Sequence, residues 1–261
     1  MAIFQCKVKS QKLCNNTDVT VFIPYLPPGP VKEGGPYPYR SHRYQVLYLL
    51  HGHSGDNQDW VTHTNIINYA QERQLAVIMP SAWDSFYCDM AYGKAFWAYI
   101  SEELPYFIES MFPVSTRRED TFVAGLSMGG YGAMKLGLHH PERFCAAASL
   151  SGVLDLSRGE DLEGIADTMR NVFGTGPVKE DDLMYVLERG VRSGVKLPDL
   201  YVACGTADFL YQQNQNFLNK AKSLNVPVKY EEEAEAGHEW SFWDTYIRRV
   251  LDWLPLIHGP V

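Results

Sequence analysis

Short apolar runs alternate along the chain with longer segments in which apolar residues recur every three or four positions. Wholly apolar runs are typical of strands in a parallel sheet that is buried on both faces. Apolar residues at every third or fourth position are typical of helices that cover such a sheet. The alternation predicts an α/β fold with a mostly parallel sheet flanked by helices. Strands are expected at residues 44–50, 75–79, 121–124, 145–151, 200–204 and 228–233, and helices at 60–73, 96–112, 128–139, 212–224 and 240–254.

Three parts of the chain depart from this alternation. Residues 4–9 and 17–23 alternate or carry β-branched side chains, which predicts an antiparallel pair at a sheet edge. Residues 24–40 hold six prolines and three glycines and are expected to form an exposed loop. Charged helical pieces separated by glycines follow residue 153, so we expect one domain over residues 1–261 with a helical insertion at about 154–197. The insertion either covers a site or lies inert on the surface.

The densest chemical signal is Gly125-Leu-Ser-Met-Gly129, which lies between a predicted strand and a predicted helix. A serine at such a corner adopts a strained backbone conformation, and the flanking glycines let strand and helix approach each other. The pattern predicts a nucleophile elbow that projects the Ser127 hydroxyl. The alternative is a structural turn whose serine caps a helix.

A serine hydroxyl needs a base within hydrogen-bond reach and an acid that orients the base. Asp208 follows a predicted strand by four residues, and His238 lies in the loop after the next strand. The order Ser127, Asp208, His238 is the one that an elbow serine requires, so these three are the predicted catalytic residues. The alternatives are a helix-capping role for Asp208 and a surface role for His238.

The other histidines near the elbow in sequence or space have simpler roles. His139 and His140 precede a proline at a predicted helix end, where a cation complements the helix dipole. His51 is expected to brace its loop through a ring hydrogen bond. His53, two residues further along, is expected to supply its backbone N–H.

A tetrahedral intermediate needs two hydrogen-bond donors near its oxyanion. The backbone N–H groups of His53 and Met128 are the predicted pair, because one follows a buried strand and the other follows the nucleophile. Substrate contacts are expected from aromatic residues, although aromatic side chains are more often part of a core. Asp89 and Cys88, in the loop at residues 81–90, could contact substrate. The alternatives are a structural role for Asp89 and an incidental position for the Cys88 thiol. The candidate substrate contacts are Trp83, Phe86, Tyr87 and Trp240.

Composition narrows the possible partners. The formal net charge is −8 and there is no basic stripe, so neither nucleic acid nor an anionic membrane is an expected partner. The five cysteines are scattered without metal-type spacing, which favours reduced thiols in the cytoplasm and predicts no metal and no cofactor. We expect neither a signal peptide nor a membrane anchor. Homo-oligomerisation stays open.

The motifs together resemble the esterase family of α/β-hydrolases that includes esterase D, S-formylglutathione hydrolase, tributyrin esterases, and feruloyl and acetylxylan esterases. The loop signatures of the glutathione-specific members have no clear match here. The tributyrin esterase group is the most similar, which implies a serine carboxylesterase for small, short-chain esters. A carbohydrate esterase or an S-formylglutathione hydrolase-like thioesterase is the alternative. The resemblance is carried by segments 51–55, 85–89, 125–130, 205–208 and 237–238.

Overall fold

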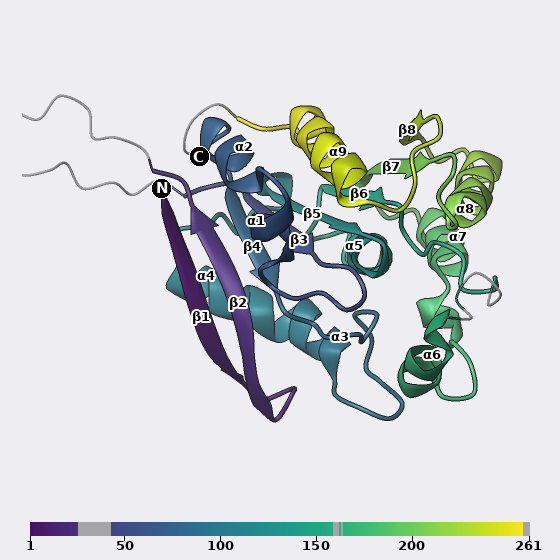
Figure 1. Ribbon diagram of the computed structural model, residues 1–261, viewed down its shortest axis with the longest axis horizontal. Coiled ribbons are helices and arrows are strands. Elements are labelled where there is room, and N and C mark those ends of the chain that lie inside the picture. Colours follow the sequence, from purple (N-terminus) through teal and green to yellow (C-terminus); the bar gives the residue numbers. More distant parts are fainter. Residues whose placement is uncertain (26–42, 159–161, 163, 258–261) are drawn as a thin grey trace, which may run out of the picture.

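The computed structural model describes residues 1–25, 43–158, 162 and 164–257, and its centre is a single eight-stranded sheet (Figure 1). The strands lie in the order β1-β2-β4-β3-β5-β6-β7-β8. β1 pairs with β2 and β2 with β4 in antiparallel fashion, whereas all pairs from β4 to β8 are parallel. The strands are β1 Ala2–Ser10, β2 Asn15–Ile23, β3 Val46–Leu50, β4 Ala76–Pro80, β5 Thr121–Leu126, β6 Ala146–Leu150, β7 Asp199–Gly205 and β8 Val228–Glu233.

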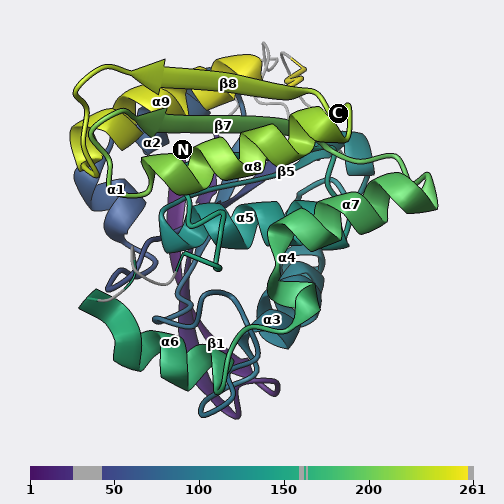
Figure 2. The same ribbon diagram turned by 90° about the vertical axis from the view of Figure 1, so that its right-hand side faces the viewer.

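Helices cover both faces of the sheet (Figures 1 and 2). Alternate residues of the central strands point to opposite faces, so Leu47 packs toward one face while Tyr48 packs toward the other. α1, α2 and α9 cover the first face, and α3, α4, α5, α7 and α8 cover the second. The helices are α1 Asp59–His63, α2 Ile66–Glu72, α3 Phe96–Ala98, α4 Leu104–Met111, α5 Met128–His139, α6 Ala166–Phe173, α7 Leu183–Ser193, α8 Tyr211–Ser223 and α9 Trp240–Trp253.

These elements confirm the predicted fold class and the antiparallel pair at the sheet edge. The loop expected at residues 24–40 lies almost entirely outside the described residues. The described helices of the predicted insertion include α6 and α7. α7 begins after Asp182, whose carboxylate accepts the Met184 and Tyr185 N–H groups.

One long helix predicted at residues 60–73 is in fact two, α1 and α2. The chain is extended at Thr64, whose hydroxyl donates to the Trp60 carbonyl and accepts the Ile66 N–H. The next N–H, that of Asn65, donates to Asp244 of α9 at 2.9 Å. Local side-chain hydrogen bonds therefore replace the helical ones and separate the two helices.

The helix predicted at residues 96–112 contains a wider turn, the π-helical segment η1 Tyr99–Glu103, between α3 and α4. Pro105 follows this segment and has no N–H to offer to the carbonyl of Ser101. That carbonyl instead accepts the Arg143 guanidinium at 2.5 Å. Proline thus explains the local change in helix geometry.

Candidate active site

The turn between β5 and α5 holds Ser127 in a strained backbone conformation, with φ 53° and ψ −121°. Only glycine fits on either side of it. A Cβ atom at Gly125 would lie 2.3 Å from the Gly129 carbonyl oxygen, and one at Gly129 would lie 2.5 Å from the Leu50 carbonyl oxygen. The Ser127 N–H donates to the Leu150 carbonyl at 2.9 Å. The sequence therefore folds here as the predicted elbow, with its serine at the carboxyl edge of the sheet.

Three residues that are far apart in the sequence meet at this edge. His238 Nε2 lies 3.0 Å from Ser127 Oγ, and His238 Nδ1 lies 2.9 Å from Asp208 Oδ2. Asp208 is buried, and its other oxygen accepts the Leu210 N–H at 2.8 Å before α8 begins. The carboxylate therefore holds both the imidazole and the backbone of its own loop. This arrangement allows a proton to pass from the serine to the imidazole.

Two aromatic rings flank the His238 imidazole. The Phe209 ring centroid is 4.6 Å from that of His238, and the Trp243 centroid is 4.8 Å away with its ring perpendicular. Phe209 is 56% exposed, an unusual position for a phenylalanine, and it directly follows Asp208. Phe209 was not among the predicted site residues, although its place directly after the predicted acid was a usable signal.

The two residues whose backbone N–H groups are expected to bind an oxyanion, His53 and Met128, line the same cleft as Ser127. Met128 is the first residue of α5, where N–H groups have no partner within the helix. His53 lies in the loop after β3, and no described residue accepts its N–H. Next to it, the Ser54 N–H donates to Asp84 Oδ1 at 2.5 Å. The loop is thus held from one side while the His53 N–H is left available.

His51 braces this loop from beneath, as predicted. Its Nδ1 lies 2.7 Å from the Gly52 carbonyl, and its Nε2 accepts the Ala82 N–H at 2.9 Å. The ring therefore donates through one nitrogen and accepts through the other, which is the neutral form of imidazole. Burial lowers the pKa of His51 because the charged form would lose its hydration.

The cleft has a volume of about 510 Å³, and its walls differ in chemistry. One wall comes from the loops after β4 and β6 and from the insertion, and it is apolar: Phe86, Val153, Leu162 and Ile165. The wall beside His238 is aromatic and polar. Trp240 stacks on His63 at 4.6 Å and meets Trp243 edge-on at 5.1 Å. Leu162, Gly164 and Ile165, which lie in the predicted insertion, thus line the cleft.

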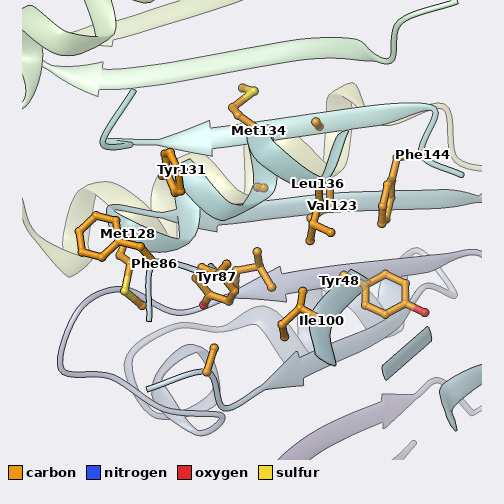
Figure 3. Packing of buried hydrophobic residues seen from close by; sticks show 14 of the residues in the cluster. Tyr48, Phe86, Tyr87, Ile100, Val123, Met128, Tyr131, Met134, Leu136 and Phe144 are labelled. Atoms are coloured by element: carbon orange, nitrogen blue, oxygen red, sulfur yellow. The ribbon is translucent and has the colours of Figure 1, made fainter. Parts of the chain in front are cut away.

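The four predicted substrate contacts divide into two pairs. Phe86 and Trp240 line the cleft, and the Phe86 ring contacts the rings of Tyr131 and Phe173. Figure 3 shows Phe86 and Tyr131 within the buried hydrophobic cluster. Trp83 and Tyr87 are not among the residues that line it. Trp83 is half exposed beside Phe96, and Tyr87 is buried with its hydroxyl donating to the His51 carbonyl at 2.9 Å.

Asp89 and Cys88 have the structural roles that were the alternatives to substrate contact. Asp89 accepts the Ala98 N–H at 3.0 Å and ties the loop to α3. The Cys88 thiol is buried 2.9 Å from the Lys135 ammonium. Within the described ranges, no three His, Cys, Asp or Glu side chains form a group that could hold a metal ion.

The sheet order, the elbow and the order of the serine, acid and histidine along the chain define an α/β-hydrolase. The chain matches the model of the family described as "Putative esterase" over residues 15–254. An acetyl esterase of Caldicellulosiruptor saccharolyticus is 31% identical over 97% of this chain and 98% of its own length. This chain belongs to that esterase family, and it is an enzyme of the serine carboxylesterase class.

Two solved structures from Staphylococcus aureus are similar over nearly their whole length. The fluorophosphonate-binding serine hydrolase F has a TM-score of 0.88 and 32% identity, covering 97% of this chain and 98% of that one. The S-formylglutathione hydrolase FrmB has a TM-score of 0.85 and 32% identity over the same shares. Within the part of the chain that the structure describes, no helix is long and apolar enough to cross a membrane.

Replacing Phe209 by Ala is expected to lower kcat for an ester about 2–10-fold with little change in KM. The reason is that His238 loses a ring contact of about 0.5–1.5 kcal/mol that orients it. Steady-state kinetics measure both constants, and Phe209→Leu should restore part of the loss. Phe4→Ala, which removes another exposed phenylalanine at β1, is the matched control. An equal loss in the control, or none at Phe209, would contradict this role.

The free energy of unfolding is expected to fall as the pH is lowered from about 7.5 to 5. Below about pH 6.5 the unfolded chain binds a proton at His51 that the folded chain resists, because burial lowers the folded pKa. His139 contributes in the same direction through its own burial and the nearby Lys135 charge.

Urea unfolding at each pH measures this dependence. His51→Gln should flatten part of it, since Gln retains a donor and an acceptor without titrating. His63→Gln, at an exposed histidine, is the control. A pH dependence in His51→Gln as steep as in the wild type would show that His51 is not responsible.

Proposed function

We propose that the chain hydrolyses small, short-chain carboxylic esters through an acyl-Ser127 intermediate. The observation that carries the proposal is the hydrogen-bonded series Ser127, His238 and Asp208 at a strained elbow inside a cleft. Ser127 is the nucleophile, His238 is the general base and then the general acid, and Asp208 orients the imidazole. The N–H groups of His53 and Met128 stabilise the oxyanion.

Each step follows from the positions of these groups. His238 Nε2 takes the Ser127 proton as Oγ attacks the ester carbonyl carbon. The oxyanion that forms accepts hydrogen bonds from the backbone N–H groups of His53 and Met128. When it collapses, the bond to the leaving alcohol breaks and His238 returns the proton to the alcohol oxygen. Water then attacks the acyl-serine with His238 again as base, releases the acid and restores the hydroxyl.

A preference for short acyl chains is supported by the apolar wall of the cleft. Val153, Leu162 and Phe86 are buried apolar side chains that line the cleft together with Ser127, so they bound the space open to an acyl chain. The acetyl esterase relative is in keeping with a small acyl group, and activity on tributyrin belongs to the same proposal. The similarity to FrmB supports, as a second candidate, hydrolysis of a small acyl thioester by the same intermediate. All five cysteines are free thiols, which supports a reducing compartment such as the cytoplasm.

Ser127→Ala is expected to lower kcat on p-nitrophenyl acetate by roughly 10⁴–10⁶ and to abolish labelling by a fluorophosphonate probe. Asp208→Asn should lower kcat by roughly 10⁴ while labelling becomes slow. Ser110→Ala, at an exposed serine of α4, is the matched control and should keep full activity. A Ser127→Ala protein that retains most of its activity would overturn the proposal.

Among p-nitrophenyl esters from acetate to decanoate, kcat/KM is expected to be highest between acetyl and butyryl. Ile165→Ala should move the optimum toward longer chains, because it shortens a side chain of the apolar wall. Ile257→Ala, at an exposed isoleucine outside the cleft, should leave the optimum in place. A wild-type optimum at decanoyl would contradict the short-chain assignment.

A further inference from the structure

The cleft carries an uneven distribution of charge. Among the described residues that line it, none is Lys or Arg, and Asp59 is the one carboxylate. Asp59 is half buried, and no described Lys or Arg forms an ion pair with it. A substrate in this cleft therefore meets a carboxylate whose charge no neighbouring cationic side chain neutralises.

The position of His238 identifies the part of the cleft where this charge acts. His238 gives its proton to the leaving alcohol, so the leaving group must lie beside its ring. Trp243 is 4.8 Å from that ring, Trp240 is 5.1 Å from Trp243, and His63 stacks on Trp240 at 4.6 Å. Asp59 precedes His63 by four residues on α1, which places the two on the same face of the helix. The Asp59 carboxylate lies beside Gly55 of the loop after β3, and it borders the same cleft as these aromatic rings.

We infer that the leaving-group side of the cleft selects esters whose alcohol carries a positive charge, such as a quaternary ammonium or amino alcohol, over esters of anionic alcohols. This inference rests on the proposed function. Aromatic rings attract cations through their faces, and tryptophan does so most strongly. A carboxylate at a partly desolvated site attracts the same cations and repels anions. The formal net charge of −8 acts in the same direction, but salt screens it more strongly.

Three acetates of similar size separate charge from shape: acetylcholine, its uncharged carbon isostere 3,3-dimethylbutyl acetate, and the anionic 2-acetoxyethanesulfonate. Release of acetic acid is measured by titration at constant pH, and kcat/KM is obtained for each ester. In Asp59→Asn, the ratio of acetylcholine to the neutral isostere should fall roughly 5–10-fold relative to wild type, as expected for one charge near a protein surface. The ratio of the sulfonate ester to the isostere should rise. Comparing ratios between two proteins cancels the intrinsic reactivity of each ester.

Asp56→Asn is the matched control because it removes the same charge three residues away. Asp56 is exposed, does not line the cleft, and accepts the Gln58 N–H at 2.7 Å, which an asparagine oxygen can also do. Its ratios should stay within about twofold of wild type, since an exposed charge outside the cleft is screened by salt and water. An equal change in both variants would assign the selectivity to net charge and would overturn the role of Asp59.

The wild-type protein gives a second measurement that needs no variant. Raising the salt concentration from about 20 to about 500 mM should reduce the preference for acetylcholine over its isostere. Hydrolysis with ratios that neither salt nor Asp59→Asn changes would overturn the inference and leave the proposed function intact. Failure to hydrolyse any of these acetates or p-nitrophenyl acetate would instead overturn the proposed function, and the inference with it.

Discussion

The close approach of β5 and α5 around Ser127 is the constraint on which the site depends. The glycines at positions 125 and 129 let backbone meet backbone where any Cβ atom would collide. This contact brings the first turn of α5 to the carboxyl edge of the sheet. As a consequence, the adjacent residues Ser127 and Met128 both line the cleft. The strained φ at Ser127 is stabilised by the packing of the elements on either side.

Parallel strand direction then determines what can join the serine. The carboxyl ends of β3, β5, β7 and β8 meet at one edge, so the loops that follow these strands converge there. His53 follows β3, Asp208 follows β7 and His238 follows β8. Residues separated by more than a hundred positions therefore come within hydrogen-bond distance without any contact local in sequence. The chemistry depends on sheet order as much as on the three side chains.

The strands, the elbow and the meeting of Ser127 with His238 could be predicted, because each has a local signature and the fold fixes their relative order. The aromatic loop after β4 could not. Trp83, Phe86 and Tyr87 all have positive φ values, which are uncommon for residues other than glycine. The directions of their side chains therefore cannot be predicted from the pattern of residues. Their directions depend on the helices against which they pack, α3 for Trp83 and α5 and α6 for Phe86. The break between α1 and α2 at Thr64 has a similar cause. The Thr64 side-chain hydrogen bonds replace the helical backbone hydrogen bonds only in the folded chain.

The position of the insertion depends on a buried charge that the sequence did not reveal. The Lys135 ammonium lies within α5, beneath the insertion, and pairs with Asp181 at 2.7 Å. Burial raises the pKa of the neighbouring Cys88 thiol to about 11, so at neutral pH that thiol is protonated and Asp181 is the anionic partner. A buried ammonium without such a partner would be costly. The Lys135–Asp181 ion pair therefore holds the segment around Asp181 against α5.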